Sequence, residues 1–277
     1  METTLAKQND SEDVKRVSTG ITSLDALLQG GFLPGRSYLV TGDAGTGKTT
    51  ACVQFLKSGL EQGEKAVYVT VDERPAEILQ AADSLGWDLQ PYVQEKGFAI
   101  LDASPYFSGR AGTLGDKGVD LQKIVSDLAA YAKKLAATRL VIDPVTPLIL
   151  SGDSPTSVQE HARTLIHLLQ QNLATTNLIT SHLPPRANND LTNGIEEFLA
   201  AGVFILRVTQ DGDRLVRTLS VKKMRGTAVE PCEYPFNIVK DHGILLLSQD
   251  RKPIPVVVEE PPGFQGLEFF QLPKEER

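Results

Sequence analysis

The residues best suited to chemistry lie between Gly42 and Thr49, which read GDAGTGKT. This stretch fits the pattern G-x-x-x-x-G-K-[ST] in full, with a β-rich run before it and a helical stretch after it. Such a loop surrounds phosphate groups with backbone N–H groups, and the helix N-terminus adds partial positive charge. We therefore predict a phosphate-binding loop (P-loop) that contacts ATP through Gly45, Thr46, Gly47, Lys48, Thr49 and Thr50.

The end of this loop and one distant carboxylate predict a Mg²⁺ site. Lys48 is expected to reach the β- and γ-phosphates, and the Thr49 hydroxyl is expected to bind the metal. A P-loop also needs a carboxylate for the metal at the end of an apolar strand, and Leu140–Asp143 ends in one. The alternative for Asp143 is an ordinary strand that ends in a turn, because Pro144 follows it.

Two further carboxylates, Asp72 and Glu73, directly follow the apolar run AVYVTV. This places them at the carboxyl edge of the predicted sheet, where ligands bind in open α/β folds. One of them could orient or deprotonate the water that hydrolysis needs. They could equally be acids before the helix that starts at Pro75, favoured there by the helix dipole. Spacing alone leaves both interpretations open.

The elements that must position these residues alternate between strands and helices along the chain. Strands are predicted at Ser37–Thr41, Ala66–Val71, Phe98–Asp102, Leu140–Asp143 and Asn177–Thr180. Helices are predicted at Lys48–Gln62, Pro75–Leu85 and Thr156–Gln171, and another places Leu121, Val125, Leu128 and Ala132 on one face. This alternation indicates an α/β fold with a mostly parallel central sheet flanked by helices.

The pattern changes after Gly202. Two β-rich runs, Val203–Val208 and Leu215–Val221, are joined by Gln210–Asp213, which predicts a hairpin with a turn longer than two residues. Two shorter β-rich runs follow, Tyr234–Val239 and Ile244–Leu247. We therefore expect an antiparallel C-terminal extension of the sheet.

Length and composition fit one domain with tails. The 277 residues suit one large α/β domain, which we place at 16–250. Residues 1–15 are polar and charged, and residues 251–277 are rich in proline and glutamate, so both are expected to be tails. Cys52 and Cys232 are expected to be reduced thiols. With no signal peptide and no long apolar run, we expect a cytoplasmic protein and no membrane partner.

The charge argues against a general nucleic-acid binder. The formal net charge is −7, and an acidic surface repels phosphate backbones. The loop 183–193 reads LPPRANNDLTN, with one arginine and no aromatic residue, whereas a single-stranded DNA groove uses several cations and stacking rings. Nucleic acid is therefore an unlikely partner.

Several segments together resemble a KaiC-type domain of the RecA superfamily. They are GITSLDALLQGGFLPGRSYLVTGDAGTGKTT, DERPAEILQAADSLGWDL, ILDASP, LVIDPVTPL, KKMRGTAVEPCEYPF and KDHGI, in family order over residues 16 to 248. The resemblance implies a RecA-like P-loop fold and slow ATP hydrolysis. It also implies a ring, usually a hexamer, with ATP at the subunit interfaces and with other signalling proteins as partners.

The resemblance also assigns residues. Glu73 matches the glutamate that activates water, and Asp72 is its paired acid. Lys223, Met224 and Arg225 belong to a K-x-R-G motif that the neighbouring subunit contributes. On a strand, Lys223 and Arg225 would project the same way, and two cations would stabilise the charge of the transition state. Without the resemblance, a solvated basic strand face would be the default. The weaker nucleotide contacts are Thr227 and Asp241 across the interface and Ser84 near the adenine or ribose.

The sequence departs from KaiC in ways that affect other expectations. Pro144, Val229 and an apparent insertion at Lys240 put base contacts in doubt. The positions at which KaiC phosphorylates itself fall on Phe198 and Leu199, which have no hydroxyl, so we expect no autophosphorylation there unless Thr192 substitutes.

Three functions follow from these residues. The leading one is a Mg²⁺-dependent ATPase in a ring that signals to other proteins. The alternatives are a RadA-like DNA repair ATPase and a switch that binds ATP without hydrolysing it.

Among the remaining polar residues, Ser181 or His182 could sense the γ-phosphate. His161 and His167 are expected to be packing or surface residues, because metal-binding histidines on one helix face are four residues apart and these are six apart.

Overall fold

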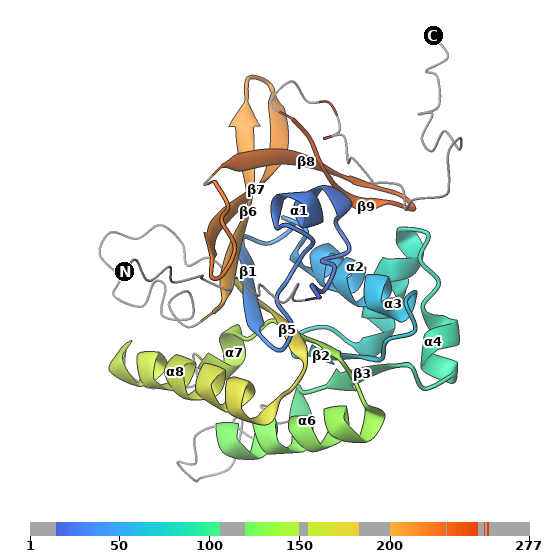
Figure 1. Ribbon diagram of the computed structural model, residues 1–277, viewed down its shortest axis with the longest axis vertical. Helices are drawn as coiled ribbons and strands as arrows, with labels where there is room; N and C mark the ends of the chain where they lie inside the picture. The colour runs from blue at the N-terminus through green and yellow to red at the C-terminus, as the bar shows by residue number, and fades with distance from the viewer. Residues whose placement is uncertain are drawn as a thin grey trace, which may run out of the picture.

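The protein is described by a computed structural model at residues 15–105, 120–149, 155–182, 200–230, 232–248, 252 and 254. These residues form a nine-stranded sheet in the order β3-β2-β4-β5-β1-β6-β7-β8-β9 (Figure 1). The strands are β1 (Ser37–Gly42), β2 (Ala66–Thr70), β3 (Phe98–Asp102), β4 (Arg139–Asp143), β5 (Thr176–His182), β6 (Gly202–Asp211), β7 (Arg214–Met224), β8 (Glu233–Val239) and β9 (Gly243–Leu246). Strands β1 to β6 pair in parallel and β7 to β9 add antiparallel, which confirms the predicted fold class.

Helices cover both faces of the parallel strands. They are α1 (Thr22–Leu27), α2 (Lys48–Leu60), α3 (Pro75–Ser84), α4 (Gln90–Gln94), α6 (Leu121–Leu135), α7 (Thr146–Ile149) and α8 (Pro155–Asn172). Figure 1 shows α6 and α8 on one side of the sheet and α2 and α3 on the other. The sequence did not reveal α4 and α7, because helices of five and four residues are too short to show a periodic pattern.

Side chains of the central strand β1 alternate between the two layers of the core. Tyr38 and Val40 belong to the buried cluster that includes α2, and Leu39 belongs to the cluster that includes α6 and α8. This is the period of two expected for a strand covered on both faces. A strand buried in this way reads as a continuous apolar run, as the segment before the P-loop does.

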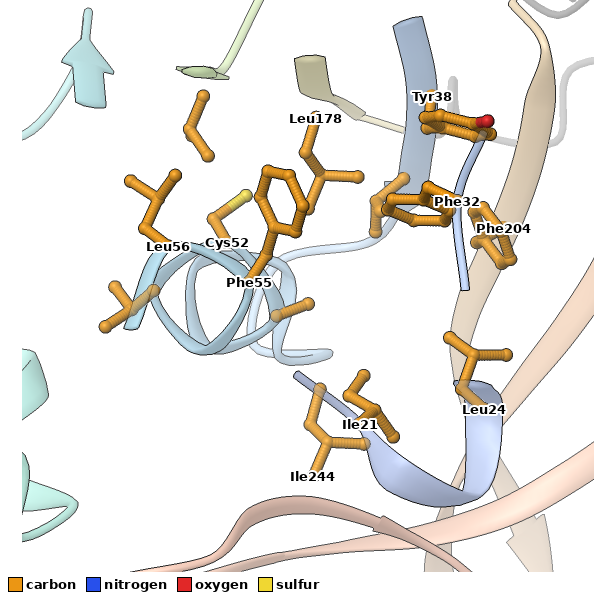
Figure 2. Close-up of a cluster of buried hydrophobic side chains, with 14 of the residues drawn as sticks. Ile21, Leu24, Phe32, Tyr38, Cys52, Phe55, Leu56, Leu178, Phe204 and Ile244 are labelled. Atoms are coloured by element: carbon orange, nitrogen blue, oxygen red, sulfur yellow. The ribbon is translucent and has the colours of Figure 1, made fainter. Parts of the chain in front are cut away.

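Aromatic rings pack beside α2 in the first of these clusters (Figure 2). Phe32 stacks on Tyr38 with ring centroids 3.9 Å apart and tilts against Phe55 and Phe204. The helix contributes Cys52, Phe55 and Leu56 to this layer, and all three are buried. This contact holds α2, whose first turn carries the phosphate-binding residues, against the sheet.

A partly buried ion pair links β4 to the turn that follows α2. Arg139 is fully buried and pairs with Glu64 over 2.8 Å. Nη1 of Arg139 donates to the carbonyls of Ser18 and Phe55, each over 2.7 Å. One side chain therefore joins the N-terminal segment, helix α2 and the start of β4, and this fixes their mutual positions.

The β6–β7 hairpin differs from the prediction. Asp211 pairs directly with Arg214, so the turn consists of Gly212 and Asp213 alone, with φ of +60° at Gly212. The expectation of a longer turn was wrong, because both strands extend past their apolar runs into polar residues. Apart from residue 15, residues 103–105, and residues 252 and 254, the predicted tails and the predicted loop at 103–117 lie outside the described residues. In the part of the chain that is described, no helix has the length and apolar character needed to cross a membrane.

Candidate nucleotide site

The P-loop joins the end of β1 to the start of α2 at the carboxyl edge of the sheet. Gly45 and Gly47 have φ of +74° and +106°. A Cβ at Gly47 would lie only 3.0 Å from Cδ1 of Ile238. The backbone conformation favours glycine at position 47, since other residues rarely adopt this region, and an added Cβ would also require the end of the Ile238 side chain to move slightly.

Lys48 lies inside this loop. Its Nζ donates to the carbonyls of Gly42 and Asp43, each over 2.8 Å, and the residue is only 7% exposed. Burial lowers the pKa of Lys48, while the nearby Asp143 and Asp43 act in the opposite direction. The ammonium group is therefore bound to loop carbonyls at the place where the motif predicts phosphates.

Asp143 accepts hydrogen bonds from three hydroxyl groups. Its Oδ2 accepts from Thr49 over 2.9 Å and from Tyr68 over 2.5 Å, and its Oδ1 accepts from Thr180. Burial, followed by the charge of Asp143, raises the pKa of Tyr68 well above 10, so the phenol remains protonated and donates. Of these residues, the sequence predicted only Thr49 and Asp143 as members of the site, and it did not predict Tyr68 or Thr180.

The arrangement of Thr49 and Asp143 fits a Mg²⁺ ion. The Thr49 hydroxyl donates its hydrogen bond to Asp143, so the lone pairs of its oxygen stay available to a cation. Mg²⁺ prefers oxygen ligands and is commonly held by one or two protein groups together with phosphates and water. Among the described residues, no group of three or more His, Cys, Asp or Glu side chains could hold a metal by itself. Thr49 and Asp143 therefore fit a Mg²⁺ ion whose other ligands would be phosphate oxygens and water.

Asp72 and Glu73 follow β2 and face the same pocket. The backbone of Glu73 is held by Thr70, whose hydroxyl donates to the Glu73 carbonyl over 2.7 Å and accepts from its N–H over 3.2 Å. The acid that caps α3 is Glu77, which accepts from the N–H of Arg74 over 2.8 Å. Asp72 and Glu73 line the pocket instead, which supports the catalytic interpretation, while their interaction with the dipole of α3 stays an alternative.

The pKa of Glu73 is raised. Desolvation is the largest cause, and the negative charges of Asp143, Glu77 and Asp72 add to it in that order. A carboxylate that gains basicity from its surroundings is a better proton acceptor, which suits a group that activates water.

A pocket of about 400 Å³ collects most of the predicted site. Its lining contains Gly45, Gly47, Lys48, Thr49, Thr50, Asp72, Glu73 and Asp143, together with Ala44, Pro144, His182 and Ile238. Thr46 is fully buried and donates instead to the Asp43 carbonyl over 2.9 Å.

Of the two candidate sensors, only His182 lines this pocket. Its position in β5 is opposite Gly42, at the start of the P-loop, whereas Ser181 is buried. Ile238 comes from β8, and no sequence signal pointed to it, because antiparallel strand pairing far along the chain brings it to the loop.

The basic pair lies at the opposite edge of the sheet. Lys223 pairs with Val203, and the N–H of Arg225 donates to the Ala201 carbonyl over 2.7 Å. Next to them, Gly202 pairs with Tyr38 near the start of β1. Gly42 at the P-loop is four positions further along β1 than Tyr38, which is about 13 Å along the strand.

Lys223 and Arg225 were expected to project the same way because both would lie on one strand, and the structure supports this only for Lys223. Strand β7 ends at Met224, so Arg225 lies in the turn after it and strand alternation does not determine where it points. A register shift between Val203 and Phe204 further interrupts the regular pairing beside Lys223.

The three weaker candidates lie outside the pocket. The Ser84 hydroxyl donates to the Ala81 carbonyl over 2.7 Å at the exposed end of α3. Asp241 lies close to that end, because its N–H donates to the Leu85 carbonyl over 2.7 Å. The Thr227 hydroxyl accepts from Arg16 over 2.7 Å.

The structure describes the predicted thiols and histidines but not the predicted loop or phosphorylation positions. Cys52 and Cys232 are both free thiols, and His161 and His167 lie on α8. Phe198, Leu199, Thr192 and the loop 183–193 lie outside the described residues.

Comparison with known proteins decides the family. The family model described as "ATPase: KaiC" matches residues 17–251. The chain belongs to the KaiC ATPase family. This confirms the resemblance found in the sequence, and the matched residues form a KaiC-like domain with the ATP-binding P-loop fold of that family.

Relatives and a solved structure agree with this assignment. The chain is 39% identical over 242 residues to the circadian clock oscillator protein KaiC of Synechococcus elongatus, which covers 85% of this chain and 45% of that protein. It is 36% identical over 232 residues to KaiC of Thermostichus vulcanus, covering 83% and 44%. The chain thus spans less than half the length of these curated relatives. A KaiC-like protein from Pyrococcus horikoshii OT3 superposes with a TM-score of 0.71 at 32% identity, covering 85% of this chain and 100% of that one.

Proposed function

We propose that this protein is a Mg²⁺-dependent ATPase that hydrolyses ATP at the subunit interfaces of a ring-shaped homo-oligomer, with a hexamer as the expected size. The observation that carries the proposal is the convergence of Lys48, Thr49, Asp143 and Glu73 on one pocket. A site that only bound nucleotide would need no carboxylate of raised pKa beside the metal position.

Each residue has a separate role in this proposal. Lys48 binds the β- and γ-phosphates, and Thr49 and Asp143 hold the Mg²⁺ that neutralises phosphate charge. Glu73 orients the attacking water and accepts its proton. Asp72 supports Glu73 through its charge, and His182 lies where a residue can sense the γ-phosphate.

The position of the basic pair supports a shared site. Lys223 and Arg225 lie at the edge of the sheet opposite their own P-loop. If they stabilise the transition state, they must do so in the pocket of a neighbouring subunit. A head-to-tail arrangement of identical subunits that closes into a ring makes such contacts possible.

The assembly test is light scattering coupled to size exclusion, with and without Mg²⁺-ATP, together with phosphate release. Wild type should assemble with ATP, and Arg225→Ala should still assemble but lose turnover. Hydrolysis by a wild-type monomer, or an unchanged Arg225→Ala variant, would contradict the proposal.

A mixing experiment tests the shared site directly. Lys48→Ala lacks the phosphate lysine and Arg225→Ala lacks the partner cation, so each alone should be inactive. In mixed rings, an intact P-loop meets an intact Arg225 at some interfaces, and part of the activity should return. No recovery in rings shown to be mixed would place both residues in the same subunit's site.

We also propose a regulatory or signalling role without autophosphorylation, because Phe198 and Leu199 occupy the expected phosphorylation positions. Mass spectrometry after incubation with Mg²⁺-ATP should find no phosphate on serine or threonine. The RadA-like alternative would instead require that DNA stimulates hydrolysis at moderate salt. The non-hydrolysing switch would require ATP-driven assembly without phosphate release.

A further inference from the structure

Tyr68 places a phenol on the carboxylate of the metal site. The residue lies in β2, which pairs with β4 so that Tyr68 is opposite Val141. Its side chain is fully buried, and its hydroxyl donates to Oδ2 of Asp143 over 2.5 Å. The same oxygen accepts from Thr49 over 2.9 Å.

The hydroxyl of Tyr68 occupies one of the hydrogen-bond acceptor positions of the Asp143 carboxylate. Each oxygen of a carboxylate offers about two acceptor positions. Thr49 and Tyr68 occupy those of Oδ2, and Thr180 occupies one on Oδ1. Asp143 is thus held at both oxygens, by groups from β2 and β5 as well as from α2.

We propose that Tyr68 is a positioning residue for the metal–nucleotide site, since its hydroxyl holds Asp143 in the orientation that accepts the Thr49 proton. With the Thr49 hydroxyl donating to Asp143, the lone pairs of the Thr49 oxygen would be available to a bound cation. The inference rests on the proposed function, because it assigns Tyr68 to the Mg²⁺ site of that reaction. Tyr68 is not among the residues that line the pocket, so it would act through Asp143.

Packing alone does not account for the hydroxyl. Tyr68 belongs to the apolar cluster beside α2, where a phenylalanine ring would fill the same space. A buried hydroxyl costs free energy unless it is hydrogen-bonded, and the partner here is Asp143. Groups that orient a metal ligand in this way typically change metal affinity by about 10–100-fold when they are removed.

Tyr38 offers a matched control. It is also a fully buried tyrosine in a strand of the same sheet and the same cluster. Its hydroxyl accepts from the Leu33 N–H over 2.7 Å and donates to the Leu33 carbonyl over 3.0 Å, away from the P-loop. Tyr68→Phe and Tyr38→Phe therefore each delete one buried phenol oxygen, but only the first touches Asp143.

The experiment measures binding of a fluorescent ATP analogue to both variants and wild type, first in EDTA and then across a Mg²⁺ titration. For Tyr68→Phe we expect an unchanged affinity in EDTA and a Mg²⁺ half-saturation about 10-fold higher than in wild type. Turnover should recover at saturating Mg²⁺, because the residue orients a ligand and does not react. Tyr38→Phe should lower the melting temperature without moving the Mg²⁺ half-saturation.

The outcomes separate this inference from the proposed function. If wild type needs Mg²⁺ but Tyr68→Phe has the wild-type half-saturation, the role of Tyr68 is wrong and the proposed function stands. If Tyr38→Phe shifts the half-saturation equally, the effect is one of general stability, and the inference also falls. If wild type gains no nucleotide affinity from Mg²⁺, the proposed metal site fails and Tyr68 loses its role with it.

Discussion

The Thr49 hydroxyl donates to Oδ2 of Asp143 over 2.9 Å, across 94 residues of sequence. Thr49 lies in the first turn of α2 and Asp143 at the end of β4, and β5 separates β4 from β1 in the sheet. The contact therefore depends on the order of three strands and on the placement of α2. It joins the phosphate loop and the proposed metal carboxylate into one site.

Replacing Asp143 with asparagine should abolish the effect of Mg²⁺. The amide removes the negative charge that holds the cation, while the surrounding packing is kept. We expect nucleotide affinity in EDTA to change little and the gain from Mg²⁺ to fall by at least about 10-fold. Calorimetric titration with and without Mg²⁺ checks this, with the exposed Asp83→Asn as control. A full Mg²⁺ response in Asp143→Asn would exclude Asp143 from the metal site.

Replacing Glu73 with glutamine should remove turnover but not binding. A lost general base typically costs about 10²–10⁴-fold in rate. Steady-state phosphate release and nucleotide titration measured in parallel separate the two effects. If Asp72→Asn loses turnover and Glu73→Gln keeps it, the roles of the two acids are reversed.

The pH dependence of turnover should report Glu73. Its pKa is raised above the ordinary 4.5, mainly by burial and then by Asp143, Glu77 and Asp72. The base must be deprotonated, so activity should decline as pH falls through this raised pKa. Asp72→Asn removes the smallest of the negative contributions and should move the acid limb slightly to lower pH. A shift to higher pH would contradict this explanation.

Breaking the Arg139–Glu64 pair should destabilise the domain. Glu64→Gln leaves a fully buried guanidinium without its countercharge, which should lower the free energy of unfolding by about 3 kcal/mol. This is near the low end of the range for breaking a buried ion pair, because Glu64 is partly exposed. The control is Glu61→Gln, which breaks the exposed Lys57–Glu61 pair and should cost no more than about 1 kcal/mol. Urea denaturation of the three proteins measures both effects, and equal losses would contradict the role of burial.

The same pair should make stability depend on pH. Hydrogen bonding to Arg139 lowers the pKa of Glu64 below the ordinary 4.5. A lowered folded-state pKa contributes stability that is complete above 4.5 and is lost as pH falls through the lowered value. The difference between wild type and Glu64→Gln should therefore shrink below pH 4.5 in urea denaturation. A constant difference would mean that the carboxylate charge does not contribute.

Alanine at Gly47 should impair nucleotide binding beyond its effect on stability. Its Cβ would meet Cδ1 of Ile238 at 3.0 Å, with φ of +106°. Gly63→Ala is the control, since its φ is +78° and nothing lies within 4 Å of the added Cβ. Both substitutions carry a backbone cost of about 1–2 kcal/mol, but only Gly47→Ala should weaken ATP binding. Unchanged binding by Gly47→Ala would show that the loop tolerates the displacement.

Short runs of residues predicted the parts of the structure that depend on neighbours along the chain. The P-loop, the strand that ends at Asp143 and the acids after β2 were all recognisable, because each is a short run whose composition dictates its local structure. The alternation of strands and helices also predicted the mostly parallel sheet. Family segments in the right order then predicted the KaiC-type assignment, which the comparisons confirmed.

The contacts between side chains far apart in the chain became known from the three-dimensional fold. Tyr68 and Thr180 reach Asp143, and Ile238 reaches Gly47, through strand order and register, for which one sequence carries no local signal. The same register places Lys223 and Arg225 at the edge of the sheet away from their own P-loop. Local patterns therefore identify the phosphate loop and its acids, whereas pairing between strands far apart in the chain determines what surrounds them.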